Sequence, residues 1–138
     1  MAENTKKVVV DASVILAKLL PDEKQSSKVK KLFISFGRRE VDFIAPQLLK
    51  FEISNALKSA VKQKRLTQLV AEKLLAAFLE LPVIYQEVDF LEVLKTALKE
   101  NLSAYDAAYV YLAREKKTAL VSLDQRLIKV GGKVGGAE

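Results

Sequence analysis

The 138-residue sequence contains neither histidine nor cysteine, and each absence restricts the chemistry that the protein can perform. Without cysteine there are no disulfides, no thiolate metal ligands and no cysteine nucleophile. Without histidine there is no Ser-His-Asp triad, no common general base and none of the usual zinc ligands. Any catalysis must therefore use carboxylates, hydroxyls, lysines or a hard metal ion.

Glycine and proline are also scarce, at five and three residues, whereas half of the residues are hydrophobic. This composition is typical of a globular chain, and 138 residues suffice for one domain with a substantial core. We therefore expect a single domain over residues 1–138, with the glycine-rich segment from about 131 to 138 as a frayed tail.

No long uncharged apolar run occurs in the sequence, and the first residues, MAENTKK, are polar. A membrane span needs roughly 18 such residues, and a secretion signal needs an apolar segment near the start. We expect neither, and hence a cytoplasmic protein with no membrane partner. The net charge of +6 favours a polyanionic partner such as nucleic acid, although an excess of lysine is also common on solvated surfaces.

Short apolar runs alternate along the chain with longer segments of helical periodicity. The runs predict strands at 8–10, 41–46, 83–85 and 119–122. The periodic segments predict helices at 14–20, 24–36, 47–64, 68–81, 89–99 and 103–116, and a short one from 124. Strands separated by helices predict an α/β fold, a three-layer α/β/α sandwich around a parallel sheet of four or five short strands.

Two aspartates follow buried strands directly. Asp11 lies between the apolar runs VVV and VIL, at a strand-to-helix turn, and Asp124 follows ALVS in the same way. Each could be an N-cap, since aspartate accepts hydrogen bonds from the first turn of a helix. Each could also contribute to a ligand site, because open α/β sheets bind ligands beyond the carboxyl ends of their strands.

Two further carboxylates lie on helices. Glu52 borders the apolar stripe of its helix, where a carboxylate must be paired, hydrogen-bonded or bound to a metal. Asp106 lies in the first turn of the next-to-last helix, where it could also be the capping-box partner of Ser103. If these acids and the two strand-end aspartates converge, their repulsion requires a cation. Oxygen ligands suit Mg²⁺ or Mn²⁺, which can activate water against a phosphodiester without histidine.

Four segments of the sequence, VVVDASV, FEISNAL, LSAYDAAYVYLA and LVSLDQRL, resemble the successive motifs of PIN-domain proteins, particularly VapC-like toxins. The resemblance covers nearly the whole chain up to the glycine-rich tail. It implies a Mg²⁺- or Mn²⁺-dependent endoribonuclease, the toxin of a toxin-antitoxin pair. It implies an acidic quartet of Asp11, Glu52, Asp106 and Asp124, with supporting polar groups at Ser13, Asn55 and Ser122.

The resemblance also implies protein partners, namely a second copy of the chain and a small antitoxin whose apolar tail fills a groove among the amino-terminal helices. Residues that could line this groove, unless they belong to the core, are Leu16, Leu20, Leu32, Phe33 and Phe36. Basic residues that could contact RNA phosphates, unless they form an ordinary solvated face, are Lys58, Lys62, Lys64, Arg65, Arg126 and Lys129.

Other families fit the sequence less well. A haloacid-dehalogenase-like phosphatase needs a second aspartate two residues after the first, where this chain has Ser13. A receiver-like phosphoacceptor needs an acidic pair before its first helix, and Glu3 is poorly placed for that role. A PIN-like module that binds RNA or protein without cutting is the alternative from another functional class, and a metal-dependent cleavage assay separates it from the nuclease.

Overall fold

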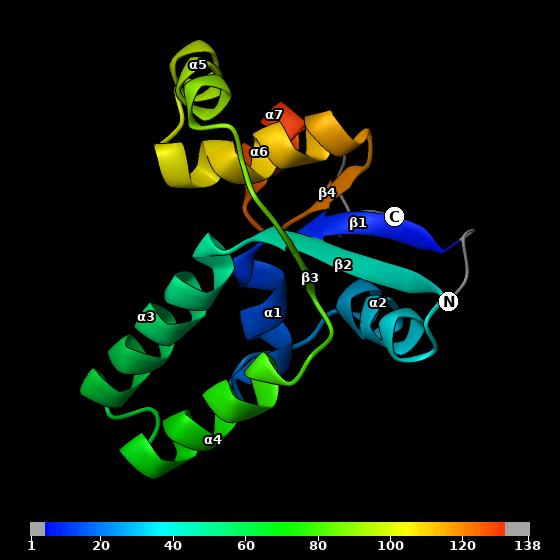
Figure 1. The fold of residues 1–138 in the computed structure, drawn as a ribbon. Helices are drawn as coiled ribbons and strands as arrows, with labels where there is room; N and C mark the ends of the chain where they lie inside the picture. The colour runs from blue at the N-terminus through cyan, green and yellow to red at the C-terminus, as the bar shows by residue number, and fades with distance from the viewer. Residues whose placement is uncertain (1–4, 132–138) are drawn as a thin grey trace.

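The computed structural model describes residues 5–131, and in this part of the chain strands and helices follow the predicted order (Figure 1). The strands are β1 (Lys6–Val10), β2 (Val41–Pro46), β3 (Ile84–Gln86) and β4 (Ala119–Val121). The helices are α1 (Ala12–Leu19), α2 (Ser27–Gly37), α3 (Leu48–Lys62), α4 (Gln68–Leu79), α5 (Phe90–Glu100), α6 (Ala104–Lys116) and α7 (Gln125–Gly131). The predicted tail falls almost entirely outside the described residues.

The four strands form one parallel sheet in the order β3-β2-β1-β4. Val10 at the end of β1 is in register with Val121 at the end of β4. The residues that follow these two strands, Asp11 and Ser122, therefore emerge side by side at the carboxyl edge of the sheet. Val9 and Val10 are completely buried, as expected for strands covered on both faces.

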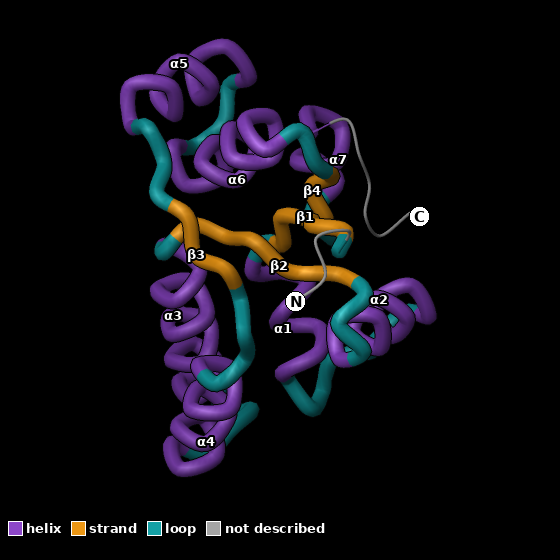
Figure 2. The backbone as a smooth tube through the Cα atoms, turned by 45° about the vertical axis from the view of Figure 1, so that its right-hand side comes forward, coloured by secondary structure: helices purple, strands orange, loops and turns teal. Residues whose placement is uncertain are grey.

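Helices cover both faces of the sheet, and Figures 1 and 2 show the resulting three layers. On one side lie α1, α2, α3 and α4, with α4 packed against α3; on the other side lie α5, α6 and α7, with α6 against β1 and β2. The predicted three-layer α/β/α sandwich around a parallel sheet is therefore confirmed, and the sheet has four of the four or five strands expected.

Capping residues decide where the helices begin and end. The α2 helix starts at Ser27 rather than at the predicted residue 24, because the Ser26 hydroxyl caps it by accepting from the N–H of Val29. The α3 helix stops at Lys62, two residues early, because Lys64 adopts a left-handed conformation with φ of 62°. The caps predicted at Asp89 and Ser103 are present at α5 and α6. No helix within residues 5–131 is both long and apolar enough to cross a bilayer.

Candidate active site

Asp11 is the most deeply buried of the four acids in the acidic group, which are Asp11, Glu52, Asp106 and Asp124. Its side chain caps α1, because Oδ1 accepts hydrogen bonds from the N–H groups of Ser13 (3.1 Å) and Val14 (3.4 Å). The residue is nevertheless only 5% exposed, and its burial raises the pKa of the carboxyl above the ordinary 3.8 although four hydrogen bonds oppose the shift. A cap alone needs no such burial, so capping does not fully explain this aspartate.

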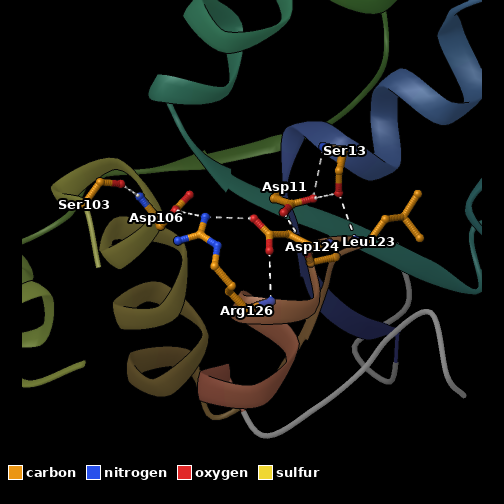
Figure 3. Close-up of polar contacts among 8 residues, drawn as sticks. Asp11, Ser13, Ser103, Asp106, Leu123, Asp124 and Arg126 are labelled. Carbon is orange, nitrogen blue, oxygen red and sulfur yellow. Dashed lines mark hydrogen bonds and ion pairs between the residues drawn. The ribbon is translucent and has the colours of Figure 1, made fainter. Parts of the chain in front are cut away.

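Two serine hydroxyls hold the Asp11 carboxylate from opposite sides. The hydroxyl of Ser13 donates to Oδ1 (2.6 Å) and that of Ser122 donates to Oδ2 (2.5 Å). Both hydroxyl oxygens also accept a hydrogen bond from the turn after β4: Ser122 from the N–H of Asp124 and Ser13 from the N–H of Leu123, each at 2.9 Å. Ser13 thereby joins the start of α1 to the β4–α7 turn (Figure 3). Ser122 links Asp11 to the N–H of Asp124, so the two aspartates are fixed relative to each other.

Glu52 is half-buried on α3 and its partner is a tyrosine that the sequence patterns did not single out. The buried Tyr109 hydroxyl donates to Oε1 of Glu52 at 2.6 Å. Burial raises the pKa of Glu52, the Tyr109 bond lowers it, and the negative charges of Asp106 and Asp11 raise it further. Glu52 therefore lies within electrostatic reach of Asp106 and Asp11. The only sequence signal for Tyr109 was its position, one helical turn after Asp106.

Replacing Tyr109 with Phe is expected to lower the free energy of unfolding by about 1–2 kcal/mol at neutral pH, since the ionised Glu52 loses its hydrogen bond. The hydrogen bond favours the ionised form, so its loss raises the pKa of Glu52 still further. The difference between wild type and variant should therefore be largest at pH 7–8 and shrink as Glu52 becomes protonated in acid. Urea unfolding of wild type and variant from acidic pH to pH 8 measures this difference in unfolding free energy. A difference that does not change with pH would mean that the whole effect comes from packing.

Asp106 and Asp124 both form an ion pair with the same arginine side chain, that of Arg126. The Nη2 atom of Arg126 lies 3.1 Å from Oδ2 of Asp106 and 3.1 Å from Oδ2 of Asp124 (Figure 3). Asp106 does not complete a capping box, because its side chain turns toward Arg126 while the Ser103 hydroxyl alone caps α6. Asp124 does cap α7, since its Oδ1 accepts from the N–H of Arg126 at 2.9 Å.

The donor chemistry of the site fits a hard divalent cation, although the side chains do not enclose one as they stand. Among residues 5–131 no three acids are close enough together to hold an ion. The guanidinium of Arg126 lies between Asp106 and Asp124, which shows that these two carboxylates together attract positive charge. The four acids offer only oxygen atoms, the ligands that Mg²⁺ and Mn²⁺ prefer. Asn55, predicted to support the site, is exposed on α3 one turn after Glu52.

Comparison with known proteins shows the family of this chain. A family profile for the PIN domain matches residues 8–133. The chain belongs to the PIN domain family. It is 36% identical to Ribonuclease VapC9 of Mycobacterium tuberculosis over 124 residues, which is 90% of this chain and 91% of that protein. It is 30% identical to Ribonuclease VapC3 of Pyrobaculum aerophilum over 125 residues, 88% of this chain and 92% of that one.

Two solved structures share this PIN fold. The crystal structure of PAE2754 from Pyrobaculum aerophilum superposes with a TM-score of 0.75 at 20% identity, over 96% of this chain and 90% of that one. The crystal structure of FitAcB from Neisseria gonorrhoeae gives a TM-score of 0.53 at 15% identity, over 92% and 94% of the two chains. The predicted membership of the PIN family is thus confirmed in both sequence and fold.

The basic residues suggested for RNA are distributed unevenly over this PIN domain. Lys58 and Lys62 are exposed toward the far end of α3, and Lys64 is exposed just after it. Lys62 comes ten positions after Glu52, about 15 Å along the helix axis. Arg65 forms ion pairs with Asp22 (2.8 Å) and Glu23 (3.5 Å), which occupy its guanidinium. The remaining two lie on α7, where Arg126 joins the acids and Lys129 is exposed.

The predicted groove residues divide between core and surface. Leu20 is buried, and Leu16 and Leu32 pack partly against the core. Phe33 and Phe36 also contact the core, because Phe36 stacks on Phe43 with ring centroids 4.0 Å apart. Both phenylalanines in addition line a cavity of about 640 Å³ beside α2, together with Ile34, Lys18, Lys30 and Arg39.

Proposed function

We propose that this PIN domain is a Mg²⁺- or Mn²⁺-dependent endoribonuclease and the toxin of a toxin-antitoxin pair. The observation that carries the proposal is the group of acids at the carboxyl edge of the sheet, where Asp11 is held by two serines and Asp106 and Asp124 share one cation. The relatives named as VapC ribonucleases match along nine-tenths of the chain and support RNA as the substrate.

The roles that we propose for the residues follow from their contacts. Asp11, Glu52, Asp106 and Asp124 would hold the divalent cation, which would polarise the scissile phosphate and activate water. Ser13 and Ser122 orient the Asp11 carboxylate, and the same hydroxyls fix the backbone that carries Asp124. Tyr109 orients Glu52, and its hydrogen bond opposes the rise in the pKa of Glu52 that burial causes.

The test is cleavage of a fluorescently labelled RNA by the purified protein in Mg²⁺, in Mn²⁺ and in EDTA. The proposal expects cleavage in either metal and none in EDTA. Binding of RNA without cleavage in any of the three conditions would contradict it and would favour the non-catalytic PIN-like module instead.

We further propose that Lys58, Lys62, Lys64 and Lys129 bind the RNA backbone, since each is exposed. Changing Lys58, Lys62 and Lys64 together to Gln should weaken binding to all RNA sequences alike. It should also flatten the salt dependence by about 0.7 in log–log slope for each phosphate that the protein no longer neutralises. Fluorescence anisotropy between about 50 and 300 mM salt would measure both. An unchanged slope would move the RNA-binding face elsewhere. Arg65 is left unchanged because its removal would break the ion pair with Asp22.

The antitoxin is proposed to bind at the cavity beside α2. Phe33, Ile34 and Phe36 offer apolar contacts there, and Lys18, Lys30 and Arg39 surround them with positive charge. These features favour a peptide that carries both apolar and acidic side chains.

The homodimer is proposed to form through the outer face of α5. This helix exposes an apolar stripe of Phe90, Leu91, Leu94 and Leu98, each more than half exposed. Contiguous exposed apolar side chains mark protein interfaces. Light scattering at micromolar concentration should give a dimer for the wild type and a monomer after Leu94→Glu and Leu98→Glu together. Leu69→Glu, at an exposed leucine of α4, is the matched control and should leave the dimer intact. A wild-type monomer would contradict the proposal.

A further inference from the structure

Arg126 forms ion pairs with two members of the acidic group, Asp106 and Asp124. A single nitrogen, Nη2, contacts both aspartates, although Asp106 lies on α6 and Asp124 lies in the turn between β4 and α7. The side chain is 66% exposed and reaches the two acids from the first turn of α7. Within residues 5–131, Arg126 is the one basic side chain that forms an ion pair with any of the four acids.

The guanidinium of Arg126 lies between two of the proposed metal ligands, where a divalent cation would bind. It contacts the Oδ2 atoms of both aspartates, so a divalent cation that binds these oxygens must compete with the guanidinium for their negative charge. Repulsion between the guanidinium and the cation adds to this competition. Asp124 also has its other oxygen, Oδ1, bonded to the backbone N–H of Arg126, and that bond does not depend on the arginine side chain.

We propose that Arg126 is a built-in competitor of the metal: its guanidinium neutralises Asp106 and Asp124 in the metal-free protein and must leave them before a divalent cation binds. The inference rests on the proposed metal site and adds to it a residue that sets the metal concentration at which the site fills. Leaving costs little, because the guanidinium is exposed and exposed ion pairs are weak. The backbone bond keeps the Asp124 carboxylate oriented while the side chain moves away.

The test compares Arg126→Gln with Lys129→Gln, which removes one positive charge from the same helix at an exposed residue outside the bridge. Calorimetric titration with Mn²⁺ should show about fivefold tighter binding for Arg126→Gln than for wild type, because the competitor is gone. Lys129→Gln should change the affinity less than about twofold.

Thermal unfolding provides a second readout that a purely structural role would not produce. In EDTA, Arg126→Gln should unfold at a lower temperature than wild type, because Asp106 and Asp124 then repel without a counter-ion. In saturating Mn²⁺ this deficit should disappear or reverse, because the metal displaces the arginine in wild type as well. An arginine that only stabilised the fold would give the same deficit in both conditions.

Three outcomes would overturn the proposal. Unchanged or weaker Mn²⁺ binding by Arg126→Gln, with normal binding by wild type, would overturn the competition and leave the metal site standing. Equal tightening by Arg126→Gln and Lys129→Gln would reduce the effect to net charge. Absence of Mn²⁺ binding in both wild type and Arg126→Gln would overturn the competition together with the metal site.

Discussion

RNA cleavage by the Asp106→Asn and Asp124→Asn variants is expected to fall by at least about 100-fold, equivalent to about 3 kcal/mol of transition-state stabilisation. A neutral amide coordinates a hard divalent cation more weakly than a carboxylate does, so less metal is held and less water is activated. Single-turnover cleavage in Mn²⁺ measures this decrease directly, free of product release.

The fold should survive both substitutions, with unfolding free energies within about 1 kcal/mol of wild type. Asp106 makes no side-chain cap, since Ser103 caps α6. Asp124 does cap α7 through Oδ1, but asparagine accepts the same hydrogen bond. Urea unfolding of the same preparations separates impaired activity from impaired structure.

Asp89→Asn is the matched control for these variants. The Asp89 Oδ1 accepts from the N–H groups of Leu91 and Glu92 and caps α5, a helix outside the acidic group. Its change to asparagine should leave both cleavage and stability close to wild type. If Asp106→Asn and Asp124→Asn cut RNA as fast as Asp89→Asn, these acids are structural and the nuclease proposal is wrong.

The Asp11→Asn variant is expected to lose most of the rise in melting temperature that Mn²⁺ or Mg²⁺ produces in wild type. A ligand that binds only the folded state stabilises it by mass action, and Asp11 is the buried member of the proposed metal-binding group. A thermal shift of equal size in wild type and variant would exclude Asp11 from the site.

In EDTA at neutral pH the same variant is expected to be more stable than wild type. Burial raises the pKa of Asp11 above its unfolded value near 3.8, so an ionised Asp11 costs stability in the metal-free protein. Asparagine removes that charge and can still accept the bonds from Ser13 and Val14 that cap α1.

The stability difference between Asp11→Asn and wild type should depend on pH, because only the wild type has a titrating group at this position. Between the unfolded and the raised folded pKa of Asp11, the folded state binds more protons than the unfolded state, so stability falls as pH rises through this window. The asparagine side chain of the variant does not titrate, so the advantage of the variant over wild type should be small near pH 4 and grow toward pH 7. Urea unfolding in EDTA at several pH values measures it, and an advantage that shrinks with rising pH would contradict the burial argument.

The fold was predictable from sequence because its signals are local. The runs VVV and ALV predict buried parallel strands, and the caps at Asp89 and Ser103 set the starts of α5 and α6 where the structure has them. The α2 helix shows the limit of such reasoning. Its predicted start at residue 24 ignored Ser26, whose capping hydrogen bond competes successfully with helical periodicity.

The acids were also recognisable from sequence, because residues that follow parallel strands gather at one edge of a sheet. Asp11 and Asp124 met that condition directly, and the register of Val10 with Val121 explains why the turns that carry them lie side by side. Sequence could not choose between a cap and a site residue at Asp11. In the structure this residue is both an N-cap and the buried member of the acidic group.

The sequence by itself determined the α/β class, the order of strands and helices along the chain and the acids available for chemistry. Only the tertiary structure decided which partners those acids have. Tyr109 reaches Glu52 across 57 positions of sequence, and Arg126 reaches Asp106 across 20. Neither contact follows from a local pattern, because side-chain partners at such separations are fixed by how α3, α6 and α7 pack around the sheet rather than by propensity or periodicity.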